Sequence, residues 1–337
     1  MYKQNLCLFS ICHFLVDGIC ASALMTYGNL SMIYAIILYN TFAFSTQFIT
    51  GLLPDKYGRN REFIFISAII LLIAIIFPWP FWLRAIILGL GNSLFHVSGG
   101  HYVLKGSDKL SPLGIFVAPG AIGLFLGLSF PKLMSYLMLV FLVISLIILR
   151  EALDEKHPDK IQIEHNNKII KNRILLTNLL LIAIMMRAFG GVVVDFSWKS
   201  TFTASLMLVI FVYLGKTFGG ILADKYSINK IAIISIVSAA IFILLFNDNM
   251  ILSLLGQFAL NLSMPITLYL IYKLYPDRPG FAFGLAASAL WPGMLVGKLV
   301  ELNTLWSNIL TIISFIIGLV AIILTTKELN EEETLCQ

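Results

Sequence analysis

Long hydrophobic stretches separated by short polar segments follow one another along the whole chain. Each is close to the roughly 20 residues that an α-helix needs to cross a hydrocarbon core of about 30 Å. The stretches are too uniformly apolar for the alternating strands of an outer-membrane barrel, so we expect helices. The pattern predicts twelve spans, at 6–28, 31–53, 62–78, 82–104, 112–130, 132–150, 174–196, 200–222, 230–247, 250–273, 280–300 and 304–325.

One short polar segment occurs twice, 169 positions apart. Gly51-Leu-Leu-Pro-Asp-Lys-Tyr-Gly-Arg-Asn-Arg61 returns as Gly220-Ile-Leu-Ala-Asp-Lys-Tyr-Ser-Ile-Asn-Lys230. The first copy follows the second predicted span and the other follows the eighth, so the repeat indicates a duplicated half. Parallel repeats of this kind build secondary transporters, which hold their substrate between the halves.

The repeat and the spans together predict an all-α membrane protein made of two six-helix bundles. The bundles are expected at 1–150 and 174–326, with a polar linker at 151–173 and a tail at 327–337. The composition agrees, because 59% hydrophobic and 12% charged residues leave too little polar surface for a water-soluble globule of this size. The connections between spans, mostly under ten residues, leave no room for a separate soluble domain.

The distribution of Lys and Arg predicts how the chain is oriented in the membrane. Most of the 23 basic residues fall at the two ends, in the linker and in the loops on that same side, whereas the opposite loops hold Lys132 and Lys199. By the positive-inside rule, both termini and the linker are cytoplasmic, in the inner or plasma membrane. The net charge of +5 reflects this bias and does not indicate a nucleic-acid partner.

The repeated segment resembles the signature loop of the major facilitator superfamily. The likeness lies in Gly-x-x-x-Asp-Lys-x-Gly-Arg-x-Arg between the second and third of twelve spans, with a weaker copy between the eighth and ninth. A finer likeness resembles the fosmidomycin-resistance branch of drug-efflux carriers. It rests on His13-Phe-Leu-Val-Asp17, Gly91-Asn-Ser-Leu-Phe-His96 and Tyr272-Lys-Leu-Tyr-Pro-Asp-Arg-Pro-Gly-Phe-Ala-Phe-Gly284. In that branch Phe-His is usually followed by Pro, but here it continues as Val-Ser-Gly-Gly-His101.

The signature loop is predicted to gate the transporter. Glycine allows a close helix approach, and Asp55 lies where it can pair with a basic group or face a helix N-terminus. We expect the first copy to matter more, since Ser227 replaces the flexible glycine of the second. The gating residues are Gly51, Asp55, Lys56, Gly58, Arg59, Arg61, Gly220, Asp224 and Lys225. Of these, Lys56, Arg59 and Arg61 are expected to stay in the cytoplasmic interface, attracted to anionic headgroups.

His13 and Asp17 are the candidates for proton coupling. Ionisable residues inside spans are costly and therefore suggest function. At positions i and i+4 the two side chains share one helix face, and an imidazole beside a carboxylate can hold or release a proton near neutral pH. The alternative is a hydrogen-bonded pair that only positions helices.

Other polar residues within spans are candidates for the substrate cavity. Asn92 and Asn261 occupy equivalent places in the two halves, and Arg187 is too deep in its span to reach the interface easily. For these residues, hydrogen bonding between helices is the structural alternative. His96 and His101 are five residues apart, so no metal site is expected on that helix. The cavity candidates are Asn40, Gln47, Asn92, His96, Arg187, Lys216 and Asn261.

These features favour a secondary transporter that works by alternating access and can act as a monomer. The chain contains no phosphate-binding loop or hydrolase motif, so we expect no enzyme activity and no cofactor, and a gradient must supply the energy. Proton-coupled export of a small organic or drug-like molecule is the main hypothesis. Proton-coupled uptake of an organic anion or metabolite is the alternative. A membrane sensor or scaffold without transport is the alternative of another class.

Overall fold

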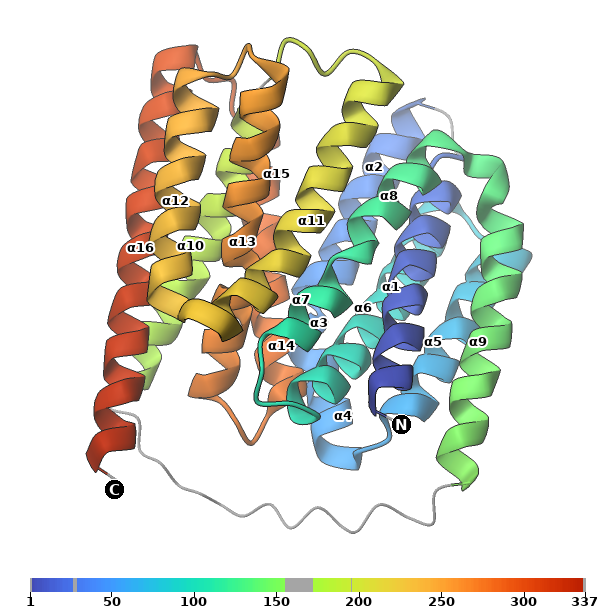
Figure 1. The fold of residues 1–337 in the computed structure, drawn as a ribbon. Helices are drawn as coiled ribbons and strands as arrows, with labels where there is room; N and C mark the ends of the chain where they lie inside the picture. The colour runs from blue at the N-terminus through green and yellow to red at the C-terminus, as the bar shows by residue number, and fades with distance from the viewer. Residues whose placement is uncertain (1, 27–28, 155–171, 195, 336–337) are drawn as a thin grey trace. The chain divides into compact units, whose positions relative to one another are not determined.

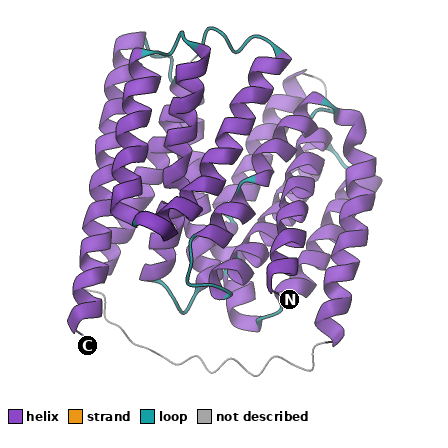
Figure 2. Cartoon of the chain, viewed as in Figure 1, coloured by secondary structure: helices purple, strands orange, loops and turns teal. Residues whose placement is uncertain are grey.

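The computed structural model describes residues 2–26, 29–154, 172–194 and 196–335, and every regular element within them is helical (Figure 2). The first half of the chain forms α1 (Tyr2–Leu24), α2 (Asn29–Asn40), the short π-helix η1 (Thr41–Ser45), α3 (Gln47–Thr50), α4 (Leu52–Tyr57), α5 (Asn60–Ile76), α6 (Phe81–Lys105), α7 (Ser111–Val117), α8 (Pro119–Ser129), the short 3₁₀-helix η2 (Pro131–Leu133) and α9 (Met134–Asp154). The second half forms α10 (Arg173–Val193), α11 (Phe202–Tyr226), α12 (Ile228–Leu245), α13 (Met250–Leu274), α14 (Pro279–Ser288), α15 (Leu290–Leu299) and α16 (Thr304–Leu335) (Figure 1).

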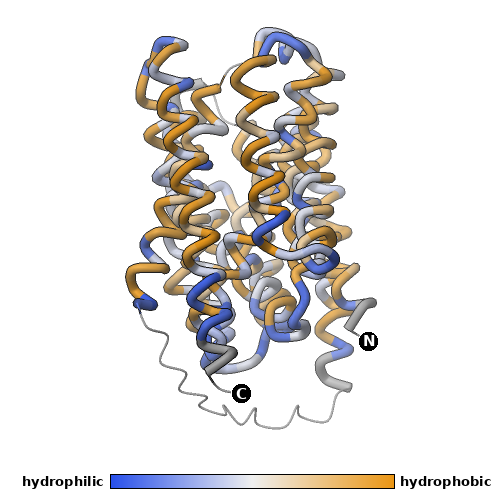
Figure 3. The backbone as a smooth tube through the Cα atoms, turned by 60° about the vertical axis from the view of Figure 1, so that its left-hand side comes forward, coloured by the Kyte–Doolittle hydropathy of each residue, from blue (hydrophilic) through white to orange (hydrophobic). Residues whose placement is uncertain are grey.

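Ten helical segments of the described chain are long and apolar enough to cross a bilayer, so this is a multi-pass membrane protein. Four of them join consecutive shorter helices: Ser31–Tyr57, Ser111–Ser129, Pro131–Glu151 and Pro279–Leu299. The remaining two predicted spans are present as α5, which has only 17 residues, and α6, which has 25 and carries several polar side chains. Hydrophobic residues cover most of each long helix, and hydrophilic ones gather toward the ends (Figure 3).

Proline residues divide two of the long segments. Pro119 begins α8 directly after the break at Ala118, and Pro292 lies in the first turn of α15 after the break at Ala289. A proline has no N–H group and its ring clashes with the carbonyl four residues earlier, so the preceding helix ends there. In the first turn of the next helix the missing N–H costs nothing, since those N–H groups lack helical partners.

The described residues form two compact units. The first comprises Met1–Ser107, Pro119–Lys168 and Tyr275–Gly284, and the second comprises Asp108–Ala118, Ile169–Leu274 and Leu285–Gln337. Each unit therefore includes a short segment from the other half of the repeat. The predicted linker at 151–173 lies mostly outside the described residues.

In the first unit, α1 packs against α6, α8 and α9, and α5 packs against α6 and α9. The side chains of Phe9, Phe95 and Phe141 are fully buried among these helices, with the rings of Phe95 and Phe141 edge to face at 5.9 Å. This packing fixes α1, which carries His13 and Asp17, beside α6, which carries His96.

In the second unit, α10 packs against α15 and α16, and α13 packs against α11 and α12. Leu180 and Ile184 on one face of α10 are almost completely buried. α16 continues to Leu335 instead of ending near residue 325. Its extension carries good helix formers and an exposed Lys327–Glu331 pair at 3.6 Å, one turn apart.

Candidate functional site

Three ionisable side chains meet between α1 and α6 of the first unit. His13 Nε2 lies 3.3 Å from Asp17 Oδ2 and 2.9 Å from His96 Nε2, and His96 Nε2 lies 3.6 Å from Asp17 Oδ1. The three side chains are between 7% and 19% exposed. The pairing of His13 with Asp17 follows from their spacing of one helical turn, but the addition of His96 required the packing of α6 on α1.

The hydrogen bonds of His96 define how protons are arranged in this cluster. His96 Nδ1 lies 2.9 Å from the backbone oxygen of Asn92, which can only accept, so the proton of neutral His96 is on Nδ1. Nε2 of His96 is then an acceptor, and His13 Nε2–H donates to it. A further proton on His96 Nε2 would set two N–H groups against each other and break this contact between α1 and α6, unless His13 then carried its proton on Nδ1.

Two neighbours hold the Asp17 carboxylate in place. Asn92 Nδ2 donates to Asp17 Oδ1 at 3.1 Å. Gly120 of α8 packs directly on the cluster, and a Cβ at that position would collide with Asp17 Oδ2 and His13 Nε2. A glycine is therefore required for α8 to approach the cluster this closely.

The same three residues could also bind a cation together. Their ligand atoms all lie within 4.8 Å of one another, and two imidazoles with one carboxylate suit a transition metal. The sequence prediction of no metal site considered the spacing of His96 and His101 along one helix, and it did not address a combination of ligands from two helices.

The first signature loop ends in a cap on helix α14. Asp55 Oδ1 accepts from the N–H of Gly280 at 2.7 Å, and Oδ2 accepts from the N–H of Phe281 at 2.8 Å. Gly51 and Gly280 lie back to back, since a Cβ on either would collide with the other's carbonyl oxygen. A carboxylate on the first N–H groups of a helix is favoured by both hydrogen bonding and the helix dipole.

His101 extends this first cap, and sequence reasoning did not assign it a role. His101 Nε2 lies 3.6 Å from Asp55 Oδ1, while its Nδ1 is 2.8 Å from Asn60 Nδ2. The side chains of His101 and Asp55 are only 3% and 8% exposed. The signal in the sequence was weak, because these residues come from three helices, α4, α5 and α6.

The second signature loop repeats the cap in the second unit. Asp224 accepts from the N–H groups of Leu110 and Ser111, both at 2.8 Å, at the start of α7. The equivalent of Leu110 in the other cap is Pro279, which has no N–H. Asp55 therefore bonds to the next two amides. Gly220 packs against Leu110 as Gly51 does against Gly280, but Asp224 is exposed.

The turn after each cap requires a positive φ. Gly58 has φ 67°, where glycine is unstrained, whereas Ser227 takes φ 145° at the matching position. The two turns differ in course, since ψ is 7° at Gly58 and 154° at Ser227. Loss of the glycine in the second copy places a side chain in a region that L-residues rarely adopt.

The basic residues of the loops divide into two groups. Lys56, Arg59 and Lys225 are exposed, as expected for residues near the lipid headgroups. Arg61 is only 7% exposed, and its guanidinium lies 5.9 Å from the centre of the Tyr102 ring. Stacking on an aromatic face inside the first unit takes Arg61 away from the interfacial position predicted for it.

Three of the predicted cavity residues turn their amides back onto their own helices. Asn40 Nδ2 donates to Ile36 O at 2.8 Å, Gln47 Nε2 to Ala43 O at 2.7 Å, and Asn261 Nδ2 to Gln257 O at 2.8 Å. Gln47 is buried, and the others are half-buried.

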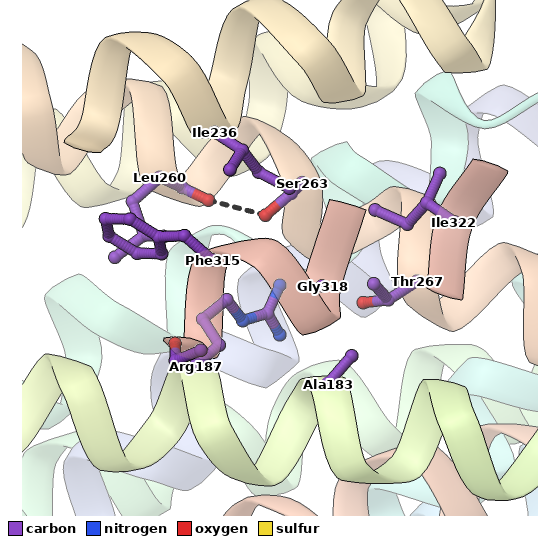
Figure 4. A pocket seen from close by; sticks show the side chains of 10 residues that line it. Ala183, Arg187, Ile236, Leu260, Ser263, Thr267, Phe315, Gly318 and Ile322 are labelled. Atoms are coloured by element: carbon purple, nitrogen blue, oxygen red, sulfur yellow. Dashed lines mark hydrogen bonds between the residues drawn. The ribbon is translucent and has the colours of Figure 1, made fainter. Parts of the chain in front are cut away.

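The two cationic candidates of the second half differ in their surroundings. Lys216 is half-buried on α11, where its carbonyl oxygen packs against Gly114 of α7. Arg187 projects from α10 into a cavity of the second unit (Figure 4). The structure therefore brings His96 and Asn92 together with the proton-coupling pair in the first unit, whereas Arg187 belongs to the second unit.

Solved structures of transporters have this arrangement of helices. The major facilitator superfamily transporter FucP, in an outward conformation, matches with a TM-score of 0.67 at 12% identity, over 96% of this chain and 99% of FucP. A variant of the E. coli fucose:proton symporter FucP matches with a TM-score of 0.66 at 12% identity, over the same shares. No protein-family model matches the chain, and no curated protein matches it by sequence. The chain thus has the major facilitator fold, which confirms the predicted fold class.

Proposed function

We propose that the protein is a secondary transporter that works by alternating access and couples export of a small organic or drug-like molecule to proton entry. The fold supports transport, and the observation that carries proton coupling is the cluster of His13, Asp17 and His96. A buried carboxylate that lies beside two imidazoles can bind or release protons, and this changes the volume of the three side chains very little. Energy then comes from the proton gradient.

The cluster provides a way to link proton binding to helix movement. The 2.9 Å contact between His13 and His96 exists only while one of the facing nitrogens lacks a proton. When both facing nitrogens carry a proton, the two N–H groups repel each other and this contact between α1 and α6 is lost. Loss of one of these protons restores the contact. In this scheme Asn92 holds Asp17 in place during both states.

The two caps support a role of the signature loops in gating. Asp55 and Asp224 each cap the N-terminus of a helix that comes from the opposite half of the sequence. We place both caps on the cytoplasmic side, where the basic loops are predicted to lie, and we assign them to the state closed on that side. Asn40, Gln47, Lys216 and Asn261 are the proposed substrate contacts that become available when the helices rearrange.

Counterflow in proteoliposomes tests this proposal. Vesicles that contain the purified protein and a candidate substrate should accumulate labelled substrate, and a pH-sensitive dye inside should report proton movement that depends on the substrate. The Asp17→Asn variant should keep counterflow and lose the proton signal, with a chelator present to remove metal effects. Proton movement equal to that of the native protein would refute the assigned coupling site.

Proton-coupled uptake is the second candidate, because a solved structure with this fold is that of a fucose:proton symporter. The direction of substrate transport under a pH gradient separates antiport from symport. An acidic exterior drives the substrate out of the cell in antiport and into the cell in symport. A susceptibility screen in cells with and without the protein identifies substrates of an exporter. Absence of counterflow for all candidates would favour a sensor or scaffold.

A further inference from the structure

A cavity lies inside the second unit, between four membrane helices. Its walls come from α10, α12, α13 and α16, and the guanidinium of Arg187 points into it toward Gly318 (Figure 4). The space around the lining atoms is about 300 Å³, part of it open to the surroundings, and only a particle of about the size of a water molecule fits clear of the atoms. Most of the remaining lining is apolar, including Leu260, Phe315 and Ile322.

Arg187 has no protein partner for its charge among the described residues. Its Nη1 is buried without a hydrogen-bond partner, and no described carboxylate lies within 4.0 Å of the guanidinium. All four surrounding helices are candidate membrane spans, so the charge lies within the membrane-spanning part of the second unit. An unpaired cation in such a setting is costly, and arginine stays protonated.

Ser314 provides a second donor in the same cavity. Ser314 is only 2% exposed, and its Oγ has no hydrogen-bond partner. The other hydroxyl groups of the lining differ, since Ser263 Oγ donates to Leu260 O at 2.7 Å and Thr267 Oγ1 donates to Met264 O at 3.0 Å. The N–H groups of Arg187 and the O–H of Ser314 are therefore the donors that a ligand in this cavity would meet.

We propose that this cavity binds a small monovalent anion, of which chloride is the probe, and that the anion neutralises Arg187 inside the second unit. A guanidinium and a hydroxyl offer only donors, which suits an anion and not a cation. The size of the cavity favours a monatomic ion over an organic substrate. The proposal goes beyond the transport function, and it assigns Arg187 a ligand other than the substrate predicted from the sequence.

Thermal unfolding of the purified full chain tests the site. Sodium chloride replaces sodium gluconate stepwise at constant ionic strength, and tryptophan fluorescence reports the unfolding midpoint. A ligand that binds only the folded state raises stability in a saturable manner. We expect the midpoint to rise and level off with chloride, to respond similarly to bromide, and to stay flat in gluconate, which is too large for the cavity.

Variants assign the effect to the cavity. Arg187→Met should abolish the chloride dependence, while Lys298→Met, at an exposed lysine, should retain it. Ser314→Ala should raise the half-saturating chloride concentration about five-fold, the loss of one hydrogen bond. A Cβ at Gly318 would still be 3.8 Å from Ile236 Cδ1, so Gly318→Val fills the cavity and should abolish the response with Arg187 in place.

The Gly318→Val variant keeps the test valid if Arg187→Met does not fold. Equal midpoints in chloride and gluconate for the native chain would overturn the proposal. So would a chloride response that persists unchanged in both Arg187→Met and Gly318→Val. In either case the charge of Arg187 would be accommodated by water or by a rearrangement of the helices, and the cavity would not be an anion site.

Discussion

Gly120 on α8 lies directly against the carboxylate of Asp17 on α1. No other residue type fits there without displacing either Asp17 or the neighbouring His13 ring. The break at Ala118 and the start of α8 at Pro119 bring this glycine to the cluster. A backbone position on a third helix therefore controls the geometry of the ionisable groups on the other two.

We expect Gly120→Ala to reduce proton-coupled transport about ten-fold. Overpacking costs about 1–3 kcal/mol, and relief here requires movement of Asp17 or His13. The rate of substrate-dependent proton movement in proteoliposomes measures the effect. Gly191→Ala is the matched control, because a Cβ there meets nothing within 4 Å. Equal losses for the two variants would indicate a general effect of the extra methyl group.

The charge of Asp17 is expected to be required for accumulation against a gradient but not for exchange. Asp17→Asn keeps the volume and an acceptor for Asn92 while it removes the group that carries the proton. We predict at least a ten-fold loss of accumulation driven by a pH gradient, roughly the loss of one charge-assisted bond. Asp248→Asn, at an exposed site, is the control that should accumulate substrate normally.

The two caps are expected to differ in importance. Asp55→Asn turns an NH₂ group toward an amide N–H in a site only 8% exposed, so we predict a transport loss of about ten-fold or more. Asp224 is exposed, and Asp224→Asn should lower transport by about three-fold or less. Initial rates of counterflow provide the comparison. Normal transport by Asp55→Asn together with loss in Asp224→Asn would reverse this order.

Substitutions at the two turns should change stability in opposite directions. Ser227→Gly removes a residue strained at φ 145° and should raise the unfolding free energy by about 1 kcal/mol. The long bond from Lys230 N to Ser227 Oγ, at 3.4 Å, makes the lost helix cap a small offset. Gly58→Ala should lower stability by about the same amount, since φ is 67° and no atom crowds the site. Unfolding midpoints measured in one detergent test both signs.

The sequence predicted the fold and part of the candidate site because both depend on local pattern. Runs of apolar residues define the helices, and the repeat at Gly51 and Gly220 marks equivalent turns. The pairing of His13 with Asp17 needs only the helical period. Asp55 at a helix N-terminus was one of two options that its position allowed, and the structure selects the start of α14.

The remaining features depend on which helices are neighbours. His96 joins Asp17 only because α6 packs on α1, and His101 reaches Asp55 only because the signature loop folds back onto α6. Arg61 was predicted at the membrane surface from its charge alone. Its burial depends on the Tyr102 ring, which lies far from it in the sequence. Contacts between distant segments are set by packing, which a single sequence does not reveal.

The reciprocal caps have a consequence for the origin of the chain. The first half supplies the carboxylate of Asp55 and receives its partner from the second half, while the second half supplies Asp224 and receives Leu110 from the first. That exchange is the pattern of an interface between two identical subunits, in which each contact occurs twice. A half-length ancestor could have made both caps as a homodimer, and after fusion each copy was free to diverge. The proline at 279 and the serine at 227 are two such divergences.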